Sequence, residues 1–157
     1  TPAVGEDDNG LFVLHIGTPD PVEQLDGDGT AGMGNNANGV AVFIGNFHFL
    51  TADITAVFQP HLYTRTRDFA TEFSEVLSMA DRVLMVPIYP ARELPIEGVT
   101  SELIGRNLTT EWQMVERDDI AATLKGLDTD VVVTFGAGNI DVVCSAVAET
   151  LRAKCNR

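Results

Sequence analysis

From Ala56 onward the chain alternates short apolar runs with segments of helical periodicity, and this alternation limits the fold more than any other feature. Runs of strand character end at Phe58 and recur at 83–88, 112–115 and 131–135. Helical spacing follows each run, around 66–77, 100–108, 118–127 and 141–153. Because parallel strands joined by crossover helices produce this order, the sequence predicts an α/β fold with a Rossmann-like, mostly parallel sheet and helices on both faces.

The first third of the chain does not share this pattern. Residues 1–55 are glycine-rich and β-rich, and residues 1–9 are expected to form a loose entry segment. The run 11–16 has the character of a buried strand, and 40–51 reads as a β-hairpin that would make the sheet mixed. We expect one α/β domain over residues 1–157, with this atypical segment before the alternating part.

Composition excludes some partners. The net charge of −13 disfavours binding to nucleic acid, because polyanions are repelled by an acidic surface. No apolar run approaches the roughly 18 to 20 residues of a membrane span, and no signal peptide is recognised, so we expect no membrane partner and a cytoplasmic location. The two cysteines are too few for a disulfide framework.

A histidine and two arginines follow the first strand of the alternation and stand at the start of a helix. Guanidinium groups bind carboxylates and phosphates, and free amides at a helix start add to the preference for anions. His61, Arg65 and Arg67 therefore suggest a site for a small anion. The alternative is that both arginines pair with surface carboxylates such as Asp68 or Glu72.

Three polar loops marked by glycine or proline, 59–67, 89–97 and 136–141, follow strands of the expected parallel sheet. In such sheets ligands bind beyond the carboxyl ends of the strands, so this edge is expected to be the working face. The turn Gly136–Ile140 suits close approach by a ligand or by the backbone, although it lacks the full dinucleotide fingerprint. Tight packing at a strand-to-helix turn explains it equally well.

Other candidate sites are weaker. The segment Gly27–Gly39 lacks the lysine of a phosphate-binding loop, and a surface loop accounts for it better. His15, His48 and Asp53 match no recognised metal-site spacing. We therefore predict no metal site, and no constellation of catalytic residues is recognised.

Four motifs after Ala56 resemble the C-terminal domain of the Mur ligase family, in the order that the family has them. They are Val57–Asp68 (VFQPHLYTRTRD), Ile88–Glu93 (IYPARE) with Pro95-Ile96, Gly98–Ser101 (GVTS) and Thr134–Ile140 (TFGAGNI). The resemblance covers about residues 56–157 and is closest to the branch of the family that joins L-alanine to UDP-N-acetylmuramate in peptidoglycan precursor synthesis.

The resemblance implies a role for each part of the expected site. His61 and Arg65 would contact the carboxylate of L-alanine. The residues expected to support or brace that loop are Tyr63, Thr64, Arg67, Arg92, Gly136, Gly138 and Asn139. The complete family enzyme has three domains and uses ATP and magnesium to activate a carboxylate as an acyl phosphate, which an amine then attacks.

The chain departs from the family in two ways. It contains no GxxGKT/S phosphate loop, so the resemblance implies part of a ligase that is not catalytically competent alone, binds no cofactor by itself and has the remaining ligase domains as partners. Residues 1–55 do not match, because a single histidine, His48, stands where the family has an Asp-Tyr-(Gly/Ala)-His-His-Pro element.

This mismatch leaves two alternatives open. The abrupt change of character at Thr55-Ala56 suggests an engineered or rearranged chimera without native activity. Residues 40–53 resemble a β-hairpin of metallo-β-lactamase-like hydrolases, which leaves a metal-dependent hydrolase fragment around His48 and Asp53 as the second. An unpaired strand beside the hairpin would also allow a homodimer.

Overall fold

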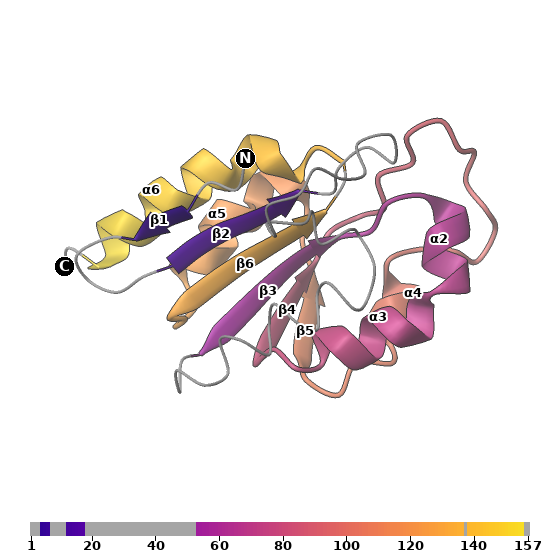
Figure 1. Cartoon of the computed structure of the whole chain (residues 1–157), viewed down its shortest axis with the longest axis horizontal. Helices are drawn as coiled ribbons and strands as arrows, with labels where there is room; N and C mark the ends of the chain where they lie inside the picture. Colours follow the sequence, from indigo (N-terminus) through magenta and orange to yellow (C-terminus); the bar gives the residue numbers. More distant parts are fainter. Residues whose placement is uncertain (1–3, 7–11, 18–52, 137, 156–157) are drawn as a thin grey trace, which may run out of the picture.

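A computed structural model describes residues 4–6, 12–17, 53–136 and 138–155, with the backbone alone for the first two of these ranges (Figure 1). The elements in chain order are β1 (Val4–Glu6), β2 (Phe12–Gly17), β3 (Ile54–Gln59), α2 (Tyr63–Asp68), α3 (Ala70–Leu77), β4 (Arg82–Met85), α4 (Glu102–Gly105), β5 (Glu111–Met114), η2 (Arg117–Asp119), α5 (Ile120–Lys125), β6 (Val131–Gly136), η3 (Ile140–Val143) and α6 (Cys144–Cys155).

The described strands form one six-stranded sheet in the order β1-β2-β6-β3-β4-β5. The pairs β2–β6, β6–β3, β3–β4 and β4–β5 are parallel, which confirms the predicted α/β fold with a parallel sheet. Strand β1 pairs antiparallel with β2, so the expectation that residues 1–9 are a loose entry segment is wrong at Val4–Glu6. The hairpin predicted at 40–51 lies outside the described residues.

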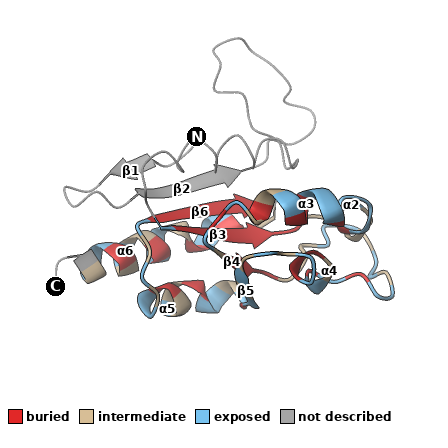
Figure 2. Cartoon of the chain, turned by 90° about the horizontal axis from the view of Figure 1, so that it is seen from below, coloured by how far each residue is buried: buried red, intermediate tan, exposed pale blue. Residues whose placement is uncertain are grey.

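The sheet separates two cores, because successive side chains of a buried strand point to opposite faces. Phe58 of β3 faces α3 and α4, where its ring lies 5.0 Å from that of Phe73. Its neighbour Val57 faces α5 and α6, and it packs with Leu124 and Val147. Figure 2 shows the buried strands between helices on both sides. This arrangement explains why β3 and β6 are apolar along most of their length.

Strand β4 is shorter than the sequence suggested. Its ladder ends at Met85, and the proline at position 87 has no N–H to continue it. The chain makes one further parallel bridge, between His61 and Tyr89, beyond the end of the regular ladder. No helix in the described ranges is long and apolar enough to cross a membrane.

The suspected join at Thr55-Ala56 lies inside β3. Both residues are fully buried and both pair with β6, at Val132 and Val133. The sheet is therefore continuous across the point where the sequence changes character.

Trp112 on β5 packs against Gly105 at the end of α4, and this contact requires glycine. A Cβ added at Gly105 would lie 2.5 Å from two carbons of the indole ring. We expect Gly105→Ala to lower the free energy of unfolding by about 1–3 kcal/mol, because the ring or the helix must move. Chemical denaturation of the purified chain measures the change.

The control for this variant is Gly126→Ala. Gly126 follows α5 with an ordinary φ of −88°, and an added Cβ would meet nothing closer than 3.6 Å. This variant is expected to stay within about 1 kcal/mol of the parent chain. Equal losses in the two variants would contradict the packing argument.

Candidate functional site

The expected working edge is formed by the carboxyl ends of β3, β6 and β4. The chain leaves β3 and β4 through α3 and α4 on one face of the sheet. Helix α5 leads into β6 on the other face, and α6 follows β6 there, so the chain leaves β3 and β6 toward opposite faces. Ligands of open α/β sheets bind in the crevice at such a point. In this chain, side chains of the protein itself occupy that place.

Gln59 and Asn139 join the two strand ends at this crevice. The Gln59 Nε2 donates to Asn139 Oδ1 at 3.0 Å, and the Asn139 backbone N–H donates to Gln59 Oε1 at 3.2 Å. Gln59 is buried, with 4% of its surface exposed. Because both polar ends of its amide are satisfied, the pair fixes the β6 turn against β3.

Glycine is required in this turn for packing. A Cβ at Gly138 would lie 2.6 Å from Tyr89 Cβ and 2.7 Å from Gln59 Oε1, and one at Gly136 would lie 2.9 Å from Ile140 Cγ2. The space is filled by the protein's own side chains. Of the two explanations open for Gly136–Ile140, tight packing is the one that the structure favours.

Tyr89 holds the segment that carries His61. Its backbone N–H donates to the Pro60 carbonyl at 2.8 Å, and its own carbonyl accepts from the Leu62 N–H at 3.0 Å. The His61 and Tyr89 rings are stacked, with centroids 5.9 Å apart and planes 18° from parallel. The histidine is thus bracketed on both sides by backbone hydrogen bonds to a neighbouring loop.

Leu62 has a positive φ of 67°, which is rare for a residue with a large side chain. Such a conformation costs on the order of 1–3 kcal/mol and persists only where surrounding contacts hold it. The Leu62 carbonyl accepts from the Thr66 N–H and from the Thr66 hydroxyl, at 3.1 and 2.8 Å. These bonds and the bond to Tyr89 hold the sharp entry into α2.

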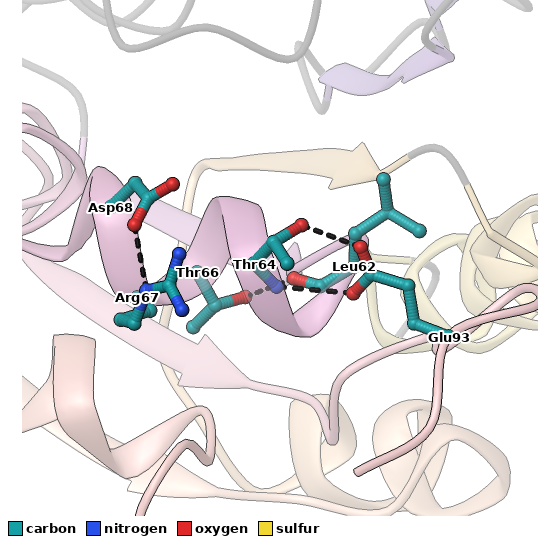
Figure 3. A network of polar contacts seen from close by, with 6 residues as sticks. All are labelled: Leu62, Thr64, Thr66, Arg67, Asp68 and Glu93. Carbon is teal, nitrogen blue, oxygen red and sulfur yellow. Dashed lines mark hydrogen bonds and ion pairs between the residues drawn. The ribbon is translucent and has the colours of Figure 1, made fainter. Parts of the chain in front are cut away.

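Glu93 takes the place of a local cap on α2 (Figure 3). One carboxylate oxygen accepts from the Thr64 N–H at 3.0 Å, and the other accepts from the Thr64 hydroxyl. These bonds, with a further one from the Tyr63 backbone, lower the pKa of Glu93. The expectation of free amides at this helix start is therefore wrong at Thr64, because Glu93 is already bound there.

The helix also begins earlier than expected. Leu62 is its N-cap and provides no side-chain cap, and Thr64 and Thr66 lie within the first turn and a half. A rule that looks only at neighbouring residues would choose Thr64 or Thr66 as the N-cap. The hydroxyls bond Glu93 and the Leu62 carbonyl instead.

The two arginines of α2 differ. Arg67 pairs with Asp68 at 2.7 Å, as the surface-pairing alternative predicted (Figure 3). Arg65 is exposed, and no described residue makes a hydrogen bond or ion pair with its guanidinium. Arg92 is likewise exposed and has no such partner among the described residues. Of His61, Arg65 and Arg67, Arg67 alone forms an ion pair within the described residues.

Burial and the nearby positive charge of Arg65 lower the pKa of His61, and the negative charge of Glu93 acts in the opposite direction. His61 is therefore neutral near pH 7. At that pH it can offer a ligand a hydrogen bond, while Arg65 supplies the positive charge.

An open cavity of about 270 Å³ adjoins this site on the side of β5. Gln59, Tyr89 and Asn139 form one wall, and Glu116 and Asp118 contribute carboxylates to another. Arg117 also lines it but is paired with Asp118 at 2.8 Å. Tyr89 thus separates the cavity from His61.

The metal alternative has no geometric support in the described ranges. No group of three His, Cys, Asp or Glu side chains in them is placed to hold a metal ion. Asp53 precedes β3, at the opposite edge from His61, and its N–H donates to Asp130. His48 and the side chain of His15 lie outside what the structure describes.

Cys144 is not favoured as a nucleophile either. Burial raises the pKa of its thiol, which disfavours the reactive thiolate.

Comparisons of the sequence with curated proteins give close relatives. The chain is 48% identical over 103 residues to the UDP-N-acetylmuramate–L-alanine ligase of Phocaeicola vulgatus, which covers 64% of this chain and 22% of the relative. It is 44% identical over 99 residues to the enzyme of the same name from Flavobacterium johnsoniae, and this match covers 62% of this chain and 22% of that relative. The chain thus spans less than a quarter of the length of these relatives. No protein-family model matches the chain.

Solved structures of ligases superpose on this chain. A UDP-N-acetylmuramate–alanine ligase from Thermotoga maritima superposes with a TM-score of 0.61 at 18% identity, over 95% of this chain and 29% of that one. A murein peptide ligase from Psychrobacter arcticus gives 0.56 at 14% identity, over 98% and 29%. At these identities the likeness shows a shared fold.

Gly138→Ala tests whether the turn is packed as described. The added methyl group would overlap Tyr89 and Gln59, so we expect a loss of about 1–3 kcal/mol in the free energy of unfolding and large amide shifts at Asn139. Denaturation and amide-resolved NMR measure both, with Gly126→Ala as the control. A variant as stable as the control, with Asn139 unmoved, would show that the turn is open.

A second prediction concerns the charge on His61. Its pKa is expected below about 6.5, the ordinary value for histidine, and Arg65→Gln should raise it because a repelling positive charge is removed. NMR titration of the imidazole measures both values. Arg67→Gln is the matched control, since it removes the same charge from the same helix and Arg67 is not among the groups that shift the pKa of His61. A pKa that Arg65→Gln leaves unchanged or lowers would contradict the described geometry.

Proposed function

We propose, since a Mur ligase C-terminal domain fits this chain, that it is the C-terminal-domain portion of an ATP-dependent UDP-N-acetylmuramate–L-alanine ligase of peptidoglycan precursor synthesis. The proposal is supported by relatives of that name at 42–48% identity, which cover about 60% of the chain. Its place in the cell would then be the cytoplasm.

One observation of the structure carries the proposal. His61 and Arg65 both follow the carboxyl end of β3, the positive charge of Arg65 acts on the pKa of His61, and the Arg65 guanidinium has no partner among the described residues. An exposed guanidinium beside a neutral imidazole suits a carboxylate, because the first provides charge and the second a directed hydrogen bond. We assign this pair to the carboxylate of L-alanine, with Tyr63, Thr64 and Glu93 shaping the start of α2.

The chain would act as one part of a larger enzyme. Its sequence contains no phosphate-binding GxxGKT/S loop, and its relatives are more than four times as long as the segment they share with it. ATP and magnesium would be bound by the remaining domains, which are the partners we propose for it. Alone, the chain would bind L-alanine weakly and form no amide bond.

An engineered or rearranged chimera without native activity is the alternative. The two relatives named above match 62–64% of the chain, whereas the Thermotoga maritima structure superposes over 95% of it. Retained binding of L-alanine at His61 and Arg65 would separate the two proposals, since a chimera selected only for folding has no reason to keep an anion site. The hairpin at 40–51 in a mixed sheet and a homodimer stay predictions.

An amide-resolved NMR titration with L-alanine tests the proposed function. We expect millimolar binding with shifts centred on His61 and Arg65, and a rise in the His61 pKa on binding, because an anion stabilises the imidazolium. By linkage, affinity should increase as the pH falls toward that pKa. Arg65→Gln is expected to abolish the response.

Two controls accompany this titration. Arg67→Gln should bind like the parent chain, because Arg67 is paired with Asp68. L-alaninamide, which lacks the carboxylate, should give no shifts at His61. A parent chain that does not respond to L-alanine, or responds equally to the amide, would contradict the carboxylate site.

A further inference from the structure

We infer that Tyr89 and Glu93, which lie in the motif Ile88–Glu93 but were given no individual role from the sequence, are positioning residues that fix where His61 and Arg65 stand. Neither needs to touch the ligand for this role. The inference rests on the proposed function only for the ligand, since the positioning itself is a property of the free protein.

The segment from His61 to Arg65 cannot hold its own shape. Helix α2 has six residues and no side-chain cap at Leu62, and the backbone of Leu62 has a positive φ. A helix this short is unstable in isolation, and a bulky residue with positive φ needs external support. The support must therefore come from elsewhere in the fold.

Tyr89 supplies the support on the side of His61. Its backbone binds the residues before and after the histidine, and its ring stacks on the imidazole. The same ring fills the space above Gly138, so the β6 turn also limits its movement. The position of the imidazole therefore depends on the segments that follow two strands, β4 and β6.

Glu93 supplies the support on the side of Arg65. Its two carboxylate oxygens bind the amide and the hydroxyl of Thr64, the residue immediately before Arg65. Glu93 also lies near enough to His61 to oppose the effect of Arg65 on the pKa of the imidazole. One carboxylate thus anchors the helix that carries the guanidinium and acts on the charge of the neighbouring imidazole.

The test uses NMR of the whole chain with Glu93→Gln and its matched control Glu97→Gln, an exposed carboxylate four residues further along the same loop. Glu93→Gln should lower the pKa of His61, move the Thr64 amide resonance and weaken L-alanine binding roughly three- to tenfold. Glu97→Gln should change none of these. A loss of stability alone would not lower the imidazole pKa in this direction.

Tyr89 is tested with a conservative pair of variants. Tyr89→Phe keeps the ring and should preserve the His61 ring-proton shifts and the affinity. Tyr89→Ala keeps the backbone bonds but removes the stack, so the His61 shifts should change and affinity should fall. Tyr89→Ala with unchanged His61 shifts, or Glu93→Gln behaving like Glu97→Gln, would overturn the inference.

The outcome separates this inference from the proposed function. If the parent chain does not bind L-alanine, while Glu93→Gln lowers the pKa of His61 and Tyr89→Ala changes its ring-proton shifts, the ligand assignment fails and the positioning role stands. If the parent chain binds L-alanine and His61 does not respond, the positioning role fails and the ligand assignment stands.

Discussion

The structure depends on β3, a strand hydrogen-bonded in parallel to β6 and β4 and buried along its whole length. Parallel pairing on both sides brings the carboxyl ends of three strands to one edge. The loops that leave those ends then have to pack against one another, because each leaves a buried strand at the same level. The neighbourhood of His61, Tyr89 and Asn139 is a consequence of this pairing.

The loops at this edge support each other, and none is stable as a local motif. The strained entry into α2 at Leu62 is held by the backbone of Tyr89, whose ring is in turn held against Gly138. Gln59 then closes the crevice between β3 and β6 through Asn139. Gln59 and Asn139 also line the open cavity beside this crevice, and His61 and Arg65 are not among the residues that line it.

The sequence predicted the parallel sheet and the place of the candidate site because both depend on local periodicity and on the direction of the strands. Apolar runs identified β3, β4 and β6, and polar residues after them identified the working edge. What could not be predicted depends on contacts between loops distant in sequence. Glu93 binds Thr64 across 29 positions, so a capping rule that searches neighbouring residues selects Thr64 and Thr66 instead. The three residues of β1 are too few to show a strand pattern.

The difference between Arg65 and Arg67 shows why spacing alone could not assign the site. Both are exposed, lie on the same helix and are two positions apart, so their spacing does not distinguish them, and only the family resemblance assigned the ligand to Arg65. Asp68 neutralises Arg67, whereas Arg65 stands beside His61 and acts on its charge. Burial lowers the pKa of His61 and the positive charge of Arg65 lowers it further, whereas a bound anion would raise it. The same geometry that suits the pair to a carboxylate therefore makes the pKa of His61 a measure of whether an anion is bound there.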